Sequence, residues 1–369
     1  MSRPVVVKAL WGAAVLVLVA GCSSGGTGGG TAPPTTSSAS PSSASPSSAA
    51  RVSVAGTLTE GLKSPWGLAE LPGGDLLVSS RDERTITRID GRTGAKTPLG
   101  EVPGVVPGGE GGLLGLAVRD GWVYAYLTAA SDNRVVRMRY GGGEGDRLGP
   151  PEPVLTGIPK GSVHNGGRIA FGPDGMLYAG TGETGRTGLA QDRSSLGGKI
   201  LRMTPEGRPR RATLPGLGGV LVRAPQRAGL AWDPAGRLWA SEFGQNTWDE
   251  LNLIEPGRNY GWPLAEGRAG KPGLVDPVAQ WPTSEASPAA SPTPGARSGW
   301  PRSGASGCGA SRSPGRSAPE SPRPPHGHVR TPAHGPRGGR RAALAGDQRD
   351  RHPGHARPGD DRILRLDVK

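Results

Sequence analysis

Cysteine and phenylalanine are nearly absent from this 369-residue chain, which contains two of each. The cysteines are Cys22 and Cys308. If Cys22 carries a lipid, as argued below, no disulfide can form and the fold has to be stabilised by packing. The apolar run Ala9–Ala20 is too short for a membrane-spanning helix.

Negative charge is also scarce, since 31 acidic residues stand against 44 lysines and arginines, giving a net charge of +13. Most of the excess arginine lies between residues 286 and 358, and the rest of the chain is nearly balanced. A basic binding face would need its charge gathered on folded elements. The distribution therefore argues against nucleic acid as a partner.

Residues 1–22 have the features of an export signal. Arg3 and Lys8 precede the apolar run, and Val19-Ala20-Gly21-Cys22 fits a lipoprotein cleavage site with Cys22 as the lipidated residue. The alternative is an ordinary signal peptide that contains a cysteine. Residues 23–50 are almost only Ser, Gly, Thr, Ala and Pro, which predicts a flexible linker. We expect an extracytoplasmic protein anchored to the cell membrane through its lipid.

A unit of a short apolar strand, a tight turn and a second strand recurs at a spacing of roughly 50 residues. Its four clearest copies begin at Gly67-Leu-Ala, Gly115-Leu-Ala, Arg168-Ile-Ala-Phe and Gly229-Leu-Ala-Trp. No helical periodicity competes with this pattern. Repeats of several strands each are typical of the blades of an all-β propeller, and we assign residues 51–287 to that domain.

Two stretches interrupt the repeat. Residues 206–228 are rich in Arg, Pro and Gly, and residues 288–358 lose nearly all apolar side chains before a closing strand within 359–369. One interpretation is disordered, low-complexity sequence. The other is that both stretches are translated out of frame, because each can be back-translated so that a shifted frame encodes propeller-like strands. On either interpretation the later blades are incomplete or disordered.

The run from Gly161 to Glu183 carries the clearest chemistry. His164 precedes a Gly-Gly turn and a strand, and a Pro-Asp-Gly turn leads to a second strand that ends near Glu183. A hairpin folds Glu183 back toward His164, so that the acid can bond one ring nitrogen and leave the other to accept a proton. This layout predicts an oriented general base. The alternatives are a turn histidine bonded to backbone and a solvated turn acid.

The chain resembles the soluble, pyrroloquinoline-quinone-dependent aldose dehydrogenases of the glucose/sorbosone dehydrogenase family. The resemblance rests on four motifs together: Gly109–Ala117, His164–Arg168 with Gly182-Glu183, Gln191–Arg202, and Ser241–Asn252 with Asn259–Pro263. It implies a six-bladed β-propeller that oxidises an aldose sugar to its lactone and passes the electrons to an acceptor that the sequence does not identify.

The resemblance also implies roles for three residues of the first two motifs. His164 would take the proton of the anomeric hydroxyl while hydride passes to the quinone. Glu183 matches the acid that pairs with this histidine, and Glu110 stands where the family has a polar residue that lines the site. A loop-exposed acid is the alternative for Glu110.

The fourth motif resembles the family's calcium site. Ca²⁺ prefers several oxygen ligands at flexible spacing. The family's carbonyl and carboxylate ligands map to Gly244, Gln245 and Asp249, and those of a second calcium to Glu250 and Tyr260. Without the resemblance, Asp249-Glu250 would be interpreted as a solvated pair of loop acids.

One departure weakens the match. The quinone carries carboxylates that need fixed cations, which the family supplies from a His-Arg-Asn motif. This chain has Pro225-Gln-Arg227-Ala at that place, so Arg227 is the candidate cofactor ligand. The departure keeps two alternatives open: a degenerate, non-catalytic propeller that binds a sugar or a protein, and a calcium-dependent propeller lactonase.

Overall fold

The computed structural model describes residues 52–141, 147–208, 229–283, 328–330, 340–346 and 361–368. These ranges consist almost wholly of strands, and their one helix, α1 (Gly188–Gln191), has four residues. The expected all-β class is confirmed and is consistent with a β-propeller. In the described part of the chain, no helix is long and apolar enough to cross a bilayer. Cys22, the linker and Arg227 lie outside the described residues.

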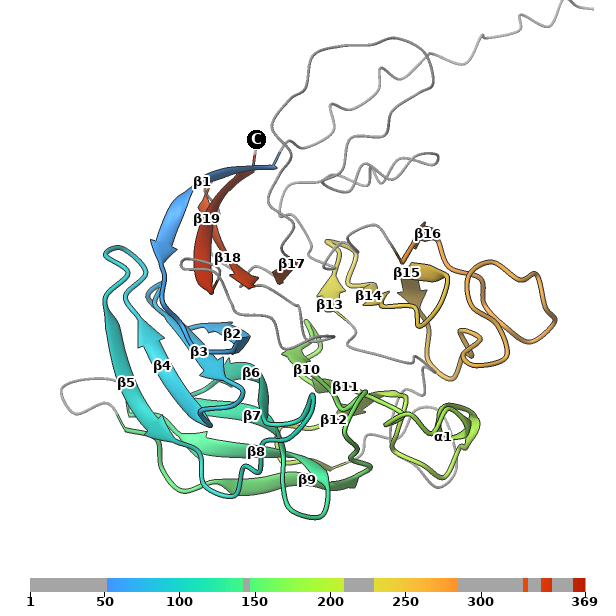
Figure 1. The fold of residues 1–369 in the computed structure, drawn as a ribbon, viewed down its shortest axis with the longest axis horizontal. Helices are drawn as coiled ribbons and strands as arrows, with labels where there is room; N and C mark the ends of the chain where they lie inside the picture. The colour runs from blue at the N-terminus through green and yellow to red at the C-terminus, as the bar shows by residue number, and fades with distance from the viewer. Residues whose placement is uncertain are drawn as a thin grey trace, which may run out of the picture. The chain divides into compact units, whose positions relative to one another are not determined.

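Two antiparallel four-stranded sheets come first, each with its strands in chain order (Figure 1). The first contains β2 (Pro65–Glu70), β3 (Leu76–Ser80), β4 (Thr85–Ile89) and β5 (Lys96–Glu101). The second contains β6 (Leu113–Arg119), β7 (Trp122–Thr128), β8 (Asn133–Arg139) and β9 (Glu152–Ile158).

Two further antiparallel sheets follow in chain order, one of three strands and one of four. The third sheet contains β10 (Gly166–Phe171), β11 (Leu177–Thr181) and β12 (Ile200–Met203). The fourth contains β13 (Gly229–Trp232), β14 (Leu238–Glu242), β15 (Trp248–Ile254) and β16 (Ala279–Pro282).

The fifth sheet joins segments that lie far apart in the sequence. It has the order β1 (Val52–Thr59), β19 (Arg362–Val368), β18 (Arg340–Gly346) and β17 (His328–Arg330). β1 and β19 are antiparallel, with Val52 opposite Val368. β17 and β18 lie inside residues 288–358, where the interpretation as disordered sequence expects no strand. β18 pairs with β19 in the antiparallel direction.

Proline marks the outer strands of the sheets. Pro98, Pro153 and Pro282 lie in β5, β9 and β16, which are the last strands of their sheets. Proline has no N–H to donate to a neighbouring strand, so it is tolerated at such an edge. The first strands β2 and β6 are almost wholly buried, and the proline of β2, Pro65, is its first residue.

Glycine lets the first strands of neighbouring sheets approach closely. β2 contacts β6, β6 contacts β10, and β10 contacts β13. A Cβ on Gly67 would lie 2.5 Å from the Leu114 carbonyl oxygen, and one on Gly115 would lie 2.1 Å from the Gly167 carbonyl oxygen. The repeated Gly-Leu-Ala triplets therefore serve the contact between sheets.

The apolar core lies between successive sheets. One cluster joins the first two sheets through residues such as Leu77 and Leu113, and the next joins the second and third through Tyr124 and Leu177. A further cluster joins the third and fourth sheets. Each sheet thus uses its neighbours to bury its faces, as the repeat requires.

Candidate functional site

The candidate residues gather at one edge of the sheets. In an antiparallel sheet, the start of the first strand and the end of the second lie at the same edge. His164 precedes β10 and Glu183 follows β11, and Gly166 pairs with Thr181 between them. By the same rule, the loop after β14 that carries Gly244 lies at this edge of the fourth sheet. We call this side of the sheets, where β10 and β13 begin and β11 and β14 end, the site edge.

His164 and Glu183 form a close pair. The Nδ1 atom of His164 lies 2.6 Å from Oε1 of Glu183, whose side chain is fully buried. A carboxylate in this position accepts the Nδ1 proton and leaves Nε2 with a lone pair. Nε2 makes no hydrogen bond with the described residues, and 14% of the His164 side chain is exposed. The solvated-acid interpretation of Glu183 is wrong, since the carboxyl is inaccessible to solvent.

The backbone of His164 is held on both sides. Its N–H donates to Oε2 of Glu110 at 2.8 Å, and its carbonyl oxygen accepts from the Thr184 N–H at 3.1 Å. The residue has a φ of 53°, a conformation that non-glycine residues seldom adopt. Glu110 therefore contacts the main chain of the candidate base, so the geometry gives it a supporting position.

Sequence reasoning missed the polar residues that hold this turn from the second sheet. Asn165 is buried, and its carbonyl oxygen accepts from the Tyr126 hydroxyl at 2.9 Å. Its side-chain Oδ1 accepts from Nδ2 of Asn133 at 3.0 Å. Asn165 adjoins His164 within its motif and offered a signal, whereas nothing in the sequence around Asn133 distinguishes it.

A second omission is Glu242, the last residue of β14. It is buried and faces Glu250 in the β14–β15 register. Burial raises the pKa of Glu242 well above its ordinary value, and the charge of Glu250 raises it further. Smaller contributions come from three other carboxylates, Glu266, Asp249 and Glu183. The charge of Glu183, the acid that pairs with His164, thus interacts with Glu242, which lies next to the predicted calcium loop in the sequence.

The predicted calcium residues are brought together in the fourth sheet. Asp249 and Glu250 are buried, so the solvated-pair interpretation is wrong. Oδ1 of Asp249 accepts from the Gly244 N–H at 2.8 Å, and Gln245 is exposed beside it. Within the described ranges, no three His, Cys, Asp or Glu side chains form a metal-binding group. A cation here would therefore rely on backbone carbonyl oxygens as well as carboxylates.

Tyr260 anchors its loop through its side chain. Its hydroxyl donates to the Leu253 carbonyl at 2.7 Å and accepts from the Glu255 N–H at 2.8 Å. Burial raises the pKa of Tyr260 to about 12. Because the hydroxyl bonds two backbone groups, the main-chain carbonyl oxygen of Tyr260 is the atom that could act as the predicted calcium ligand.

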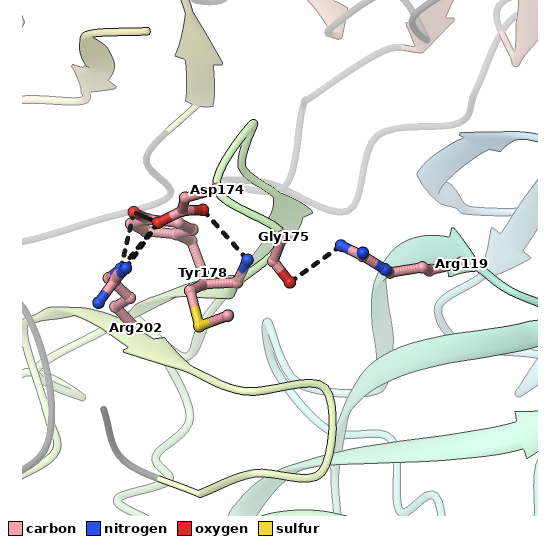
Figure 2. A network of polar contacts seen from close by, with 6 residues as sticks. Arg119, Asp174, Gly175, Tyr178 and Arg202 are labelled. Carbon is pink, nitrogen blue, oxygen red and sulfur yellow. Dashed lines mark hydrogen bonds and ion pairs between the residues drawn. The ribbon is translucent and has the colours of Figure 1, made fainter. Parts of the chain in front are cut away.

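The opposite edge of the third sheet is built differently. Asp174, in the turn between β10 and β11, accepts from the Tyr178 hydroxyl at 2.9 Å and from Nη2 of Arg202 at 2.8 Å. Figure 2 shows these side chains facing one another, with Arg119 directed at the Gly175 carbonyl. Burial alone would raise the pKa of Asp174, but hydrogen bonds, foremost from the Met176 N–H and Arg202, hold it below its ordinary value.

A model of the glucose/sorbosone dehydrogenase family matches residues 62–293. The chain belongs to the glucose/sorbosone dehydrogenase family. The match includes His164, Glu183 and the 244–260 segment.

Named relatives agree with this assignment. The chain is 29% identical over 248 residues to quinoprotein glucose dehydrogenase B of Acinetobacter calcoaceticus, covering 56% of this chain and 51% of that protein. It is 31% identical over 232 residues to aldose sugar dehydrogenase YliI of Escherichia coli K12, covering 56% and 61%. The chain thus spans about half to three-fifths of these relatives' lengths.

A solved structure is more similar. The chain is 50% identical to the aldose sugar dehydrogenase of Streptomyces coelicolor, whose structure was determined with pyrroloquinoline quinone bound. The TM-score is 0.73, and the match covers 88% of this chain and 100% of the other. At this level of similarity the family assignment extends to the three-dimensional arrangement.

The third and fourth family motifs meet through their side chains. Gln191 and Asn259 exchange two hydrogen bonds, with Nε2–Oδ1 and Nδ2–Oε1 distances of 3.3 and 3.2 Å. Lys199 is fully buried and donates to the carbonyls of Leu189 and Gly197 at 2.8 and 2.7 Å. These contacts fasten the loop that follows Glu183 and join it to the loop of Tyr260.

Proposed function

We propose that this member of the glucose/sorbosone dehydrogenase family oxidises an aldose to its lactone with pyrroloquinoline quinone. The observation that carries the proposal is the His164–Glu183 pair, with Nδ1 fixed by a buried carboxylate and Nε2 left without a partner among the described residues. An imidazole held in this way can remove the proton of the anomeric hydroxyl.

The residues at the site edge fit such a reaction. His164 accepts the hydroxyl proton at Nε2, and Glu183 stabilises the imidazolium that results. Oε1 of Glu183 bonds the ring, and Oε2 is buried without a hydrogen-bond partner among the described residues. When bound, pyrroloquinoline quinone supplies the acceptor for the hydride. Lactone formation balances with loss of one proton and one hydride from the sugar.

A calcium ion is part of the proposal. The carbonyls of Gly244 and Gln245 and the carboxylate of Asp249 would hold one ion, and Glu250 with the Tyr260 carbonyl would hold a second. The support is the concentration of buried carboxyl groups in this region, Glu242, Asp249 and Glu250, whose mutual repulsion helps to raise the pKa of Glu242. A divalent cation offsets that repulsion.

The finer architecture and location are likewise proposed. The family resemblance supports a six-bladed propeller, to which the five sheets of the described residues contribute. The cleavage site at Cys22 supports a lipid anchor on the extracytoplasmic side of the cell membrane. Turnover also requires an electron acceptor that reoxidises the reduced quinone.

A degenerate, non-catalytic propeller is the second candidate. It is favoured by Pro225-Gln-Arg227-Ala, which replaces the family's Arg-Asn clamp and leaves Arg227 as its one cation. Such a protein would bind sugar or calcium without turnover.

Reconstitution distinguishes these candidates. The full chain, incubated with pyrroloquinoline quinone and Ca²⁺, is expected to reduce a dye in the presence of glucose or another aldose. His164→Ala should lower kcat by about 10²- to 10⁴-fold while calorimetry detects unchanged calcium binding. Absence of turnover in a folded, quinone-loaded wild type would favour the binding protein, and full activity in His164→Ala would remove the histidine from the mechanism.

A further inference from the structure

The turn that carries His164 is held by a buried amide of the neighbouring sheet. Asn133, the first residue of β8, is completely buried. Its Nδ2 donates to Oδ1 of Asn165 at 3.0 Å and to the Pro159 carbonyl at 2.8 Å, and its Oδ1 accepts from the Thr128 hydroxyl at 2.6 Å. Each polar atom of this amide is therefore used, and its orientation is fixed.

Asn165 continues this arrangement into the turn. Its Oδ1 accepts from the Gly161 N–H at 3.0 Å, and its Nδ2 donates to the Gly161 carbonyl at 2.8 Å. These two bonds close the loop across His164. The Asn165 carbonyl accepts from the hydroxyl of Tyr126, a fully buried residue of β7. The turn leads into the third sheet, but hydrogen bonds to Tyr126 and Asn133 fix both of its ends to the second sheet.

The arrangement has a consequence for the imidazole. His164 has a φ of 53°, so its backbone would relax if the residues around it were released. A buried network with all its members bonded has one favoured geometry, and loss of one member leaves other polar atoms unpaired. The direction of the ring depends on this backbone because Glu183 fixes only its Nδ1 end.

We infer that Tyr126, Asn133 and Asn165 are positioning residues that set the direction of His164 Nε2. The inference rests on the proposed function for its meaning in turnover. None of the three side chains has to touch sugar or quinone, since each acts through the backbone of the turn. A displacement of about 1 Å at a reacting group lowers turnover by about a hundredfold.

A matched pair of tyrosine variants tests this. Tyr126→Phe removes one hydroxyl that donates a 2.9 Å hydrogen bond to the Asn165 carbonyl, and Tyr178→Phe removes one that donates a 2.9 Å bond to Asp174 at the opposite edge. Both rings are buried. We expect Tyr126→Phe to lower kcat about tenfold with KM unchanged, and Tyr178→Phe to leave kcat unchanged at a similar loss of thermal stability.

A spectroscopic measurement separates the inference from the proposed function. In quinone-free protein labelled with ¹⁵N-histidine, the Nδ1 proton shared with Glu183 should give a downfield resonance in wild type and Tyr178→Phe. It should shift or broaden in Tyr126→Phe and in Asn133→Asp, which replaces an amide donor by an acceptor facing Asn165. If wild type lacks turnover, the proposed function fails while this resonance still decides the inference.

The overturning result is equally defined. If kcat and the Nδ1 resonance of Tyr126→Phe both match those of Tyr178→Phe, the network stabilises the fold and does not position the base. Should Asn133→Asp fail to fold, the tyrosine pair alone decides, because removal of a hydroxyl keeps the ring and its packing.

Discussion

The polar groups at the two ends of the third sheet's strands, the site edge and the opposite edge, differ in how fully they are paired. At the site edge, His164 and Thr184 adopt positive φ values and Oε2 of Glu183 is buried without a described partner. At the other edge, Asp174 bonds Tyr178, Arg202 and backbone. Strain and incomplete pairing cost stability and tend to persist where they serve function. We infer that the site edge serves catalysis and that the opposite edge stabilises the sheet.

The carboxyl groups follow the same division. Hydrogen bonds depress the pKa of Asp174 against the effect of burial, whereas burial and neighbouring carboxylates raise the pKa of Glu242 at the site edge. One edge therefore favours an ionised acid paired with an arginine, and the other brings several buried carboxyl groups close together. The following variants test this contrast.

Gly182→Ala should have the largest effect. An added Cβ would lie 1.7 Å from the His164 carbonyl oxygen, a backbone atom that cannot move aside cheaply. We expect turnover to fall below detection in the dye-linked assay and the melting temperature to drop. Gly188→Ala, at the start of α1 in the same β11–β12 connection, is the control, because a Cβ there meets no atom within 4 Å. Equal activity of the two variants would contradict the described packing of the turn.

Glu183→Gln should come next. The substitution keeps the shape of the side chain but removes the charge that stabilises an imidazolium, so kcat should fall about a hundredfold. Asp174→Asn makes the same chemical change at the opposite edge and should leave kcat unchanged. Steady-state kinetics on the pair measure the contrast directly, and similar losses in both would show that the edges are not functionally distinct.

Arg202→Ala should affect stability alone. Its pair with Asp174 is partly exposed, so we expect the free energy of unfolding to fall by about 1 kcal/mol, with kcat retained. Because the folded pKa of Asp174 is lowered, the pair's contribution is present above the ordinary carboxyl pKa and is lost as pH falls through the lowered value. Urea denaturation at neutral and acidic pH should show the two proteins converging in acid.

Glu242→Gln should give a change of similar size in the opposite direction. The pKa of the Glu242 carboxyl is raised in the folded state. The free energy of unfolding of the protein therefore falls as pH rises from the unfolded pKa of this group to its folded pKa. In chelator at pH 8 the variant should therefore melt a few degrees above wild type, on the order expected for about 1 kcal/mol. Calcium should reduce this advantage. A lower melting point in chelator would mean that the Glu242 carboxylate already has a stabilising partner.

The repeated pattern of the sequence predicted much of the fold. Apolar strands around tight turns, with Gly-Leu-Ala at the first strand, gave the all-β class and the approximate positions of β10, β11 and β14. The pairing of β18 with β17 and β19 could not be predicted. It depends on contacts between distant segments, and the local composition there favours no strand.

The site was predictable where its residues share one hairpin. His164 and Glu183 are brought together by local turns, and their hydrogen bond is present. Glu110 precedes β6 and Asn133 begins β8, and their contacts with the His164 turn depend on how the second and third sheets pack. Glu242 could not be recognised because its burial, which raises its pKa, is a property of the packed sheet.

The union of β1 with β19 has a consequence for how the chain matures. Val52 pairs with Val368, so the two strands of this ladder are separated by most of the polypeptide. Such long-range pairing slows folding, since the entropy of closing the loop is lost before any ladder contact forms. This sheet can therefore form only after Arg362–Val368 has been synthesised, whereas the four sheets that follow chain order need no such distant partner.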